Sequence, residues 1–124
     1  MEFKDNPAIY IQIAEYVCEK ILLKKWQLGE RLVSIRELAV EMQVNPNTVQ
    51  RAYDLLQHQN IITNKRGIGY FIDDNAMERI LDFRKEQFVE NELPVFLKNI
   101  YLLNLDFKEI KALYDEFVKN NFKK

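Results

Sequence analysis

Apolar residues recur at helical spacing near the start of the chain, which predicts an amphipathic first helix. Its buried stripe comprises Tyr10, Ile13, Ala14, Val17 and Ile21. Pro7 suits the first helical position, because proline has no N–H group to leave unpaired there. We expect this helix to end at residues 26–29 and an extended link, residues 30–33, to follow.

A second, short helix is predicted to begin after Ser34. Ser34 and Glu37 fit a capping box, in which the serine hydroxyl accepts from the N–H of Glu37 and the carboxylate accepts from the N–H of Ser34. The inward face of this helix comprises Ile35, Leu38, Ala39 and Met42. We expect the helix to end near residues 43–44.

The stretch V-N-P-N-T-V-Q-R-A-Y, residues 44–53, predicts a third helix with two unlike faces. Asn45 is a good N-cap, and Pro46 suits the first helical position. The inner face carries Val49, Ala52, Tyr53 and Leu56, and the outer face carries Asn47, Gln50, Arg51 and Asp54. Amide and guanidinium groups form paired hydrogen bonds to DNA base edges. We also expect free N–H groups and the positive dipole at the start of this helix to suit a phosphate.

Two short strands are predicted next, over residues 61–64 and 69–72, with Lys65, Arg66 and Gly67 in the turn between them. A helix pair followed by such a hairpin forms a winged helix-turn-helix. Two positive charges at the tip can reach a phosphate or the minor groove. Taken alone, the helix pair also fits an ordinary bundle and the basic turn a solubilising loop, but this order of elements favours the winged helix.

The C-terminal part predicts three helices, over residues 75–92, residues 95–103 and the segment that Asp106 caps, with Asn104 as a left-handed stop. Eight of the fifteen aromatic residues lie in residues 73–124. Three short helices cannot bury so many large apolar groups, whereas pairing with a second copy can. We therefore expect a homodimer interface comprising Met77, Ile80, Leu81, Phe88, Phe96, Ile100, Leu113 and Phe117. The alternative is that this segment packs on its own N-terminal domain.

The expected fold is mainly α. A winged helix-turn-helix domain with a two-stranded β wing spans residues 1–73, and a small helical dimerisation segment spans residues 74–124.

Composition and charge agree with a single small globular protein. Of the 124 residues, 48% are hydrophobic and 30% are charged, and the net charge is −1. Between Met42 and Ile72, Asp54 is the only acid against Arg51 and the two bases of the wing. The middle of the chain is therefore locally basic although its total charge is not. The absence of a signal-like N-terminus and of a long apolar run, together with a single cysteine, favours the cytoplasm.

Several of these stretches resemble the signature of the GntR family of bacterial transcription regulators. The resemblance lies in residues 10–13 (Y-I-Q-I), 29–39 (G-E-R-L-V-S-I-R-E-L-A), 44–53 and 67–72 (G-I-G-Y-F-I). The short C-terminal part resembles the YtrA subfamily, in which a small helical segment replaces a large effector domain and makes the homodimer. The leading hypothesis is a dimeric, sequence-specific DNA-binding regulator, and more specifically a repressor, whose paired recognition helices select a near-palindromic operator. The resemblance implies that it acts in the bacterial cytoplasm.

Carried over by position, the resemblance implies DNA contacts from both helices of the pair and from the wing. Lys65 is included as well, because it is the second positive charge at the wing tip. The expected contacts are Ser34, Arg36, Asn47, Thr48, Gln50, Arg51, Lys65, Arg66 and Gly67. Three positions depart from the family's pattern. Val33 replaces the usual proline, Pro46 occupies an arginine contact of some members, and Tyr70 replaces the usual small residue.

Catalysis is not expected, because no Gly-rich phosphate loop, triad-like set or convincing carboxylate pair occurs. His58 and Cys18 lack partners at metal-ligand spacing, so neither a metal nor a cofactor is expected. The expected partners are double-stranded DNA and a second copy of the chain, without a membrane; any small-molecule effector is unknown. Two other functions remain open. One is a winged-helix protein-interaction module without DNA binding, favoured by Asp54 and the near-neutral charge, and the other is a small-molecule sensor with its ligand between the C-terminal helices.

Overall fold

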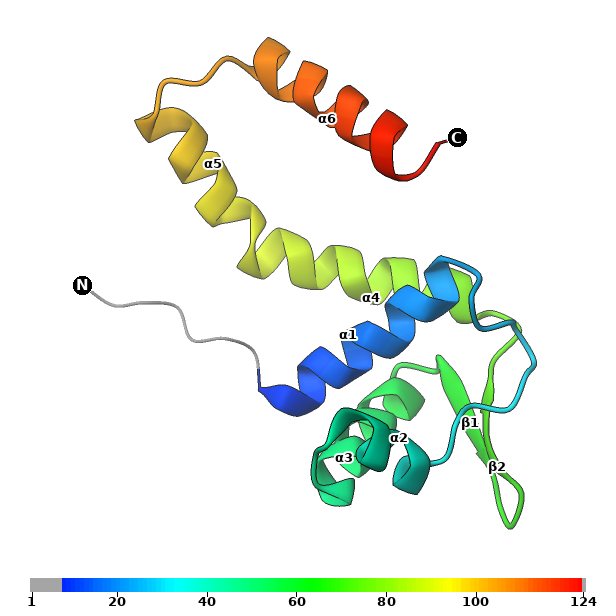
Figure 1. The fold of residues 1–124 in the computed structure, drawn as a ribbon. Helices are drawn as coiled ribbons and strands as arrows, with labels where there is room; N and C mark the ends of the chain where they lie inside the picture. Colours follow the sequence, from blue (N-terminus) through cyan, green and yellow to red (C-terminus); the bar gives the residue numbers. More distant parts are fainter. Residues whose placement is uncertain (1–7, 124) are drawn as a thin grey trace. The chain divides into compact units, whose positions relative to one another are not determined.

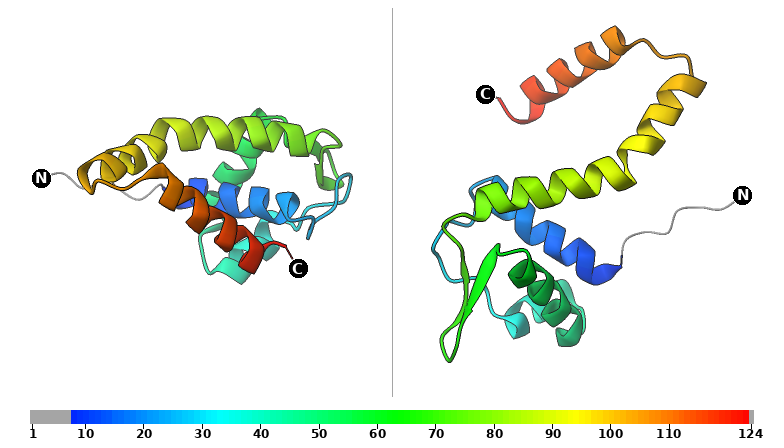
Figure 2. Two further views of the ribbon diagram at one scale, coloured as in Figure 1. Left: turned by 90° about the horizontal axis from the view of Figure 1, so that it is seen from above. Right: turned by 180° about the vertical axis from the view of Figure 1, so that it is seen from behind.

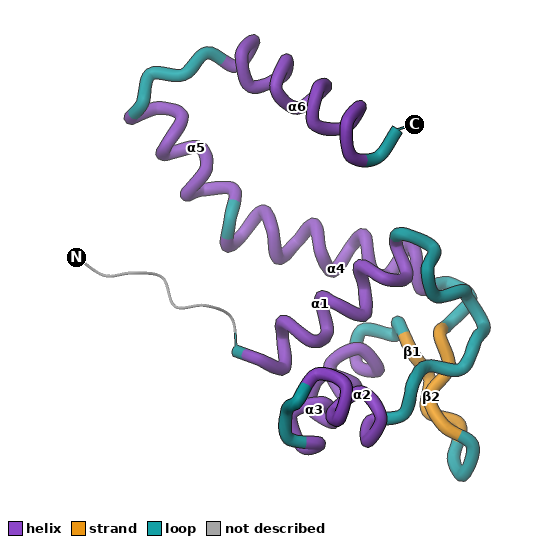
Figure 3. Tube along the Cα trace, in the orientation of Figure 1, coloured by secondary structure: helices purple, strands orange, loops and turns teal. Residues whose placement is uncertain are grey.

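The computed structural model describes residues 8–123 and is mainly helical, with one two-stranded antiparallel sheet (Figures 1 and 3). The elements are α1 (Ile9–Leu22), α2 (Ile35–Met42), α3 (Pro46–His58), β1 (Ile62–Lys65), β2 (Gly69–Ile72), α4 (Ala76–Asn91), α5 (Leu93–Leu102) and α6 (Phe107–Asn121). The chain forms two compact units, which divide between Lys85 and Glu86. The six helices and the single two-stranded antiparallel sheet confirm the expected, mainly helical fold class. Among the described helices, none has the length and apolar character needed to cross a membrane.

The core of unit 1 forms where α1 and α2 pack against α3 and α3 packs against β1. The predicted inner face of α3 is completely buried: Val49, Ala52, Tyr53 and Leu56 are all 0% exposed. The predicted stripe of α1 is buried as well, except that Tyr10 is half-buried. The hairpin tip and the α2–α3 pair lie at the same end of this unit (Figures 1 and 2).

The residues predicted to cap the N-termini of α2 and α3, Ser34 and Asn45, do so in the structure. The N–H of Glu37 donates to Ser34 Oγ at 3.1 Å, and the N–H of Asn47 donates to Asn45 Oδ1 at 2.8 Å. The turn between the two helices begins at Gln43, whose φ of 56° is left-handed. Within residues 8–123, only the serine half of the predicted capping box is formed. Both helix starts are nevertheless confirmed.

The end of α1 differs from the sequence expectation. The helix ends at Leu22, ahead of residues 26–29, because Lys24 adopts a left-handed φ of 60° and the N–H of Lys25 closes back onto Lys20 O at 2.9 Å. Trp26 then turns back onto the helix and meets the Tyr16 ring edge-on, with centroids 6.0 Å apart. Pro7, the predicted start of the helix, lies outside the described residues.

The link between α1 and α2 pairs with the wing, which the sequence did not predict. The N–H of Gly29 donates to Ile72 O at 2.8 Å, the N–H of Ile72 donates to Glu30 O at 2.9 Å, and the N–H of Leu32 donates to Tyr70 O at 2.7 Å. Strand β2 therefore has backbone partners on both sides, β1 on one and the link on the other. This second set of hydrogen bonds holds the base of the wing to the link between α1 and α2.

Helix α4 begins inside the core of unit 1. Ala76, Ile80 and Phe83 are buried there, and Met77 packs against them. The compact unit consequently extends to Lys85, past the expected boundary after residue 73. Ile80 is thus buried in unit 1 and Met77 is partly buried there, and their role in a dimer interface stays a prediction.

Unit 2 contains the rest of α4 together with α5 and α6, which do not pack closely along their lengths. Helix α5 begins at Leu93, two residues before the expected start, and Pro94 lies in its first turn. Asn104 adopts a left-handed φ of 55°, and the N–H of Lys108 donates to Asp106 Oδ1 at 3.0 Å, as predicted. Helix α6 buries no residue, and Ile100 is the one buried residue among those described in this unit. Nearly all of its apolar side chains are therefore exposed.

The buried Cys18 thiol predicts a loss of stability at alkaline pH. Burial raises its pKa to about 12 from an ordinary value of 9.0, while the Arg84 guanidinium opposes the shift. The unfolded thiol thus releases its proton first, so its contribution is complete below pH 9.0 and is lost as the pH rises toward the folded value. We expect the free energy of unfolding to fall by up to about 1.4 kcal/mol per pH unit from this group. Urea unfolding of Cys18→Ala between pH 8 and 11 should give a flatter profile, and parallel profiles would contradict this account.

Candidate nucleic-acid interface

Three elements of unit 1 carry the residues expected to contact DNA. They are the N-terminal turn of α2, the outer face of α3 and the turn between β1 and β2. Because α2 and the wing both attach to the core through α3 and the link, the three elements belong to one compact body.

At the start of α2, Ser34 and Arg36 have different environments. Ser34 is half-buried and its hydroxyl caps the helix, whereas the Arg36 side chain is exposed. Leu38 and Ala39 bury the opposite face of this short helix. Arg36 is the second residue of α2, so an exposed cationic side chain belongs to the turn at the positive end of the helix dipole, and this turn suits an anion.

The first turn of α3 does not offer the free N–H groups that the sequence suggested. The N–H groups of Asn47 and Thr48 both donate to Asn45, to its Oδ1 at 2.8 Å and to its backbone O at 2.9 Å. Pro46 has no N–H to donate. That expectation is wrong, because the N-cap residue satisfies the donors within the chain. Side chains and the helix dipole remain for contacts in this turn.

On the outer face of α3, Asn47 is exposed and Gln50 is half-buried. Gln50 Nε2 donates to Asp54 Oδ1 at 2.9 Å and to the Tyr70 hydroxyl at 3.3 Å. Tyr70 belongs to β2, so a residue of the wing contacts the helix that would enter a groove. The sequence placed Gln50 and Asp54 on one face correctly but contained no signal for the Tyr70 contact.

The Arg51 guanidinium lies over the Tyr10 ring of α1, with its central carbon 4.0 Å from the ring centroid. Such a cation–π contact contributes about 0.5–1 kcal/mol at an exposed site. Arg51 remains exposed, so the ring restricts its position without covering it. The helical spacing of Tyr10 predicted that this residue faces inward, but not that it supports an arginine from another helix.

The wing carries two exposed cations at its turn, Lys65 and Arg66. Lys65 Nζ lies 4.4 Å from the centroid of the Phe71 ring on the paired strand. Gly67 has a left-handed φ of 81°, and a Cβ there would meet no atom within 4 Å. The tip therefore needs glycine for its conformation, and it leaves open space into which a nucleic-acid backbone can approach.

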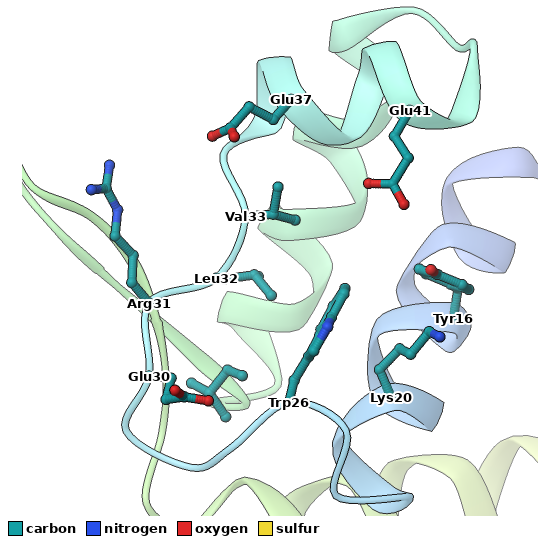
Figure 4. Close-up of a pocket in the computed structure, with 10 residues that line it drawn as sticks. Tyr16, Lys20, Trp26, Glu30, Arg31, Leu32, Val33, Glu37 and Glu41 are labelled. Carbon is teal, nitrogen blue, oxygen red and sulfur yellow. The ribbon is translucent and has the colours of Figure 1, made fainter.

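A separate cavity of about 630 Å³ opens between α1, the link, α2 and the base of the wing. Tyr16 and Lys20 line it from α1, and Glu37 and Glu41 line it from α2, while Trp26 lies between the link and α1 (Figure 4). It carries both signs of charge, and none of the expected DNA-contacting residues lines it. In residues 8–123, no group of three or more His, Cys, Asp or Glu side chains is arranged to hold a metal ion.

Comparison with known proteins agrees with this geometry. The family described as bacterial regulatory proteins, gntR family, matches residues 9–72. The chain is 34% identical over 109 residues to YhcF, an HTH-type transcriptional regulator of Bacillus subtilis, and 33% identical over 115 residues to YtrA, an HTH-type transcriptional repressor of the same species; each match covers 88% of both chains. A crystal structure of a GntR-family regulator from Bacteroides thetaiotaomicron matches with a TM-score of 0.70 at 44% identity, over 91% of this chain and 98% of that one. The chain therefore belongs to the GntR family of bacterial transcriptional regulators and carries the DNA-binding winged helix of that family.

Proposed function

We propose that this regulator binds a near-palindromic operator as a homodimer and represses transcription by occluding a promoter in the bacterial cytoplasm. The observation that carries the proposal is the outer face of α3. It presents amide and guanidinium groups beside a basic wing, while its inner face is completely buried. Repression is further supported by the similarity to YtrA, which is described as a repressor.

The proposed contacts are of two kinds, those to base edges and those to the DNA backbone. Asn47 and Gln50 carry amides, and Arg51 carries a guanidinium, which recognise base edges in the major groove. Contacts to the DNA backbone come from the start of α2 and α3, through Ser34, Arg36 and Thr48. Lys65, Arg66 and Gly67 place the wing tip against a phosphate or in the minor groove.

The proposed homodimer forms through unit 2. Large apolar side chains there are only partly covered within their own unit; Phe88, Phe96, Leu113 and Phe117 are between 43% and 62% exposed. At about 25 cal/mol per Å² of apolar surface, covering several such groups contributes several kcal/mol. A second copy offers the same surface about a two-fold axis, the commonest symmetry of protein dimers. With the exposed Leu81, which lies on the part of α4 that belongs to unit 1, and the buried Ile100, these residues form the proposed interface.

Dimerisation would also supply specificity. Two recognition helices about 34–36 Å apart meet successive turns of the major groove and select half-sites with matching spacing. Each copy has a single short recognition helix with one arginine, so the dimer doubles a small set of base contacts.

Binding to selected DNA should weaken steeply as salt rises, because phosphate contacts release counterions. Arg66→Ala should lower affinity for all sequences and reduce the log–log salt slope by about one per wing. Fluorescence anisotropy with operator and unrelated duplexes at several salt concentrations measures both quantities. Lys25→Ala, which removes an exposed charge outside the proposed interface, serves as the control. Salt-independent binding would instead favour a protein-interaction module.

Arg51→Ala should relax preference at one base pair by roughly 1–3 kcal/mol, if the guanidinium contacts a base edge. It should also lower the free energy of unfolding by about 0.5–1 kcal/mol, because the contact with Tyr10 is lost. Tyr10→Leu separates the two effects, since it removes the ring and keeps the charge. Sequence selection and urea unfolding of both variants provide the measurements; wild-type base preference in Arg51→Ala would refute a base contact.

Phe117→Asp should yield monomers, because it places a charge within the proposed apolar interface. Light scattering at several protein concentrations reports the mass, and circular dichroism reports retention of the helices. Val40→Asp is a matched control, since Val40 is 74% exposed on α2 and lies outside unit 2. An unchanged dimer of Phe117→Asp would rule out this interface.

A further inference from the structure

The surroundings of Gln50 restrict which base edge its side chain can recognise. A primary amide has two N–H hydrogens on its nitrogen and an acceptor oxygen. Gln50 Nε2 has two acceptors within the chain, Asp54 Oδ1 at 2.9 Å and the Tyr70 hydroxyl at 3.3 Å. Both hydrogens are therefore engaged before any DNA approaches.

Asp54 determines which way the amide faces. The oxygen and nitrogen of a glutamine side chain exchange places when the amide flips, and their assignment follows from the hydrogen-bond partners. An ionised carboxylate only accepts hydrogen bonds, so its neighbour at 2.9 Å must be the nitrogen. In the flipped amide, two oxygens would face each other without a hydrogen between them.

Tyr70 is itself fixed in position by the core. Its ring meets the Tyr53 ring edge-on, with centroids 5.1 Å apart, and its backbone O accepts from the N–H of Leu32 at 2.7 Å. The Tyr53 hydroxyl in turn donates to Val33 O at 2.6 Å. The wing acceptor for Gln50 is thus placed by a continuous chain of contacts from the buried face of α3.

We propose that Gln50 recognises an exocyclic amino group in the major groove, adenine N6 or cytosine N4, through Oε1 alone. This inference rests on the proposed function, because it specifies the base edge that α3 selects. Among the described residues, Oε1 accepts no hydrogen bond, so it remains for the DNA. An unrestrained glutamine pairs with adenine through both N6 and N7. Here the N7 contact is absent, since it requires an N–H that Asp54 and Tyr70 already hold.

Modified bases distinguish the one-bond contact from the paired contact. Selection from random DNA with wild-type and Gln50→Ala protein identifies the base pair whose preference depends on Gln50. Two duplexes are then compared at that pair: one lacks the exocyclic amino group of adenine or cytosine, and the other replaces the purine with its 7-deaza form. Measuring both proteins on both duplexes cancels the effect of each modification on the duplex itself.

We expect removal of the amino group to weaken wild-type binding roughly two- to tenfold more than Gln50→Ala binding, the range for one hydrogen bond. The 7-deaza duplex should affect both proteins equally. A larger loss for wild type than for Gln50→Ala on the 7-deaza duplex overturns the proposal, because it requires an N–H of Gln50 to reach N7. Unchanged selection by Gln50→Ala overturns it as well, while specific binding by the wild type would leave the proposed function standing.

A second variant tests the restraint itself. Asp54→Ala combined with Tyr70→Phe removes both acceptors and keeps the Tyr70 ring against Tyr53. The released amide should gain an N7 contact at an adenine, so binding of this variant should become sensitive to 7-deazaadenine when the selected pair is changed to contain it. Continued insensitivity would show that the two acceptors do not orient Gln50, and the proposal would fail.

Discussion

Burial of Tyr53 is the constraint on which the arrangement of unit 1 depends. Its side chain is completely buried in the middle of α3, its hydroxyl donates to Val33 O at 2.6 Å, and its ring contacts Tyr70 of the wing. Leaving a buried hydroxyl unpaired costs about 1–3 kcal/mol, so this bond selects one rotation of α3 about its axis. That rotation turns Asn47, Gln50 and Arg51 outward. One side chain thereby joins the recognition helix, the link before α2 and the wing.

The C-terminal unit, unlike unit 1, leaves most of its large apolar side chains exposed. In unit 1 the apolar side chains cover one another, whereas α6 buries none and α5 buries only Ile100. Helix α4 belongs to both units, because its first turns pack in the core and its last turns carry exposed Phe88 and Val89. This segment leaves most of its large apolar side chains exposed, and α4 joins it to unit 1 as one continuous helix.

Sequence patterns predicted the residues of the candidate interface but not their contacts within the chain. The outer face of α3 and the basic turn of the wing followed from helical spacing and hairpin signals. The sequence-based prediction missed three features. Tyr10 lies under Arg51, Tyr70 accepts from Gln50, and Asn45 occupies the first N–H groups of α3. The first two join residues far apart in the chain. The third was within reach of the sequence, because a good N-cap necessarily consumes the donors that an anion would use.

By itself, the sequence determined the order of the elements, the inner and outer face of each helix of unit 1, the caps of α2, α3 and α6, and the positions of the turns. These depend on neighbours within about four residues, where spacing and cap chemistry act directly. Only the tertiary structure decided where α1 ends, that residues 29–32 pair with β2, and that the compact unit closes inside α4 at Lys85. The pairing with β2 and the packing of α4 arise from contacts between segments distant in the chain, whose free energy local periodicity does not encode, whereas α1 ends in a local left-handed turn at Lys24 that the apolar pattern did not reveal.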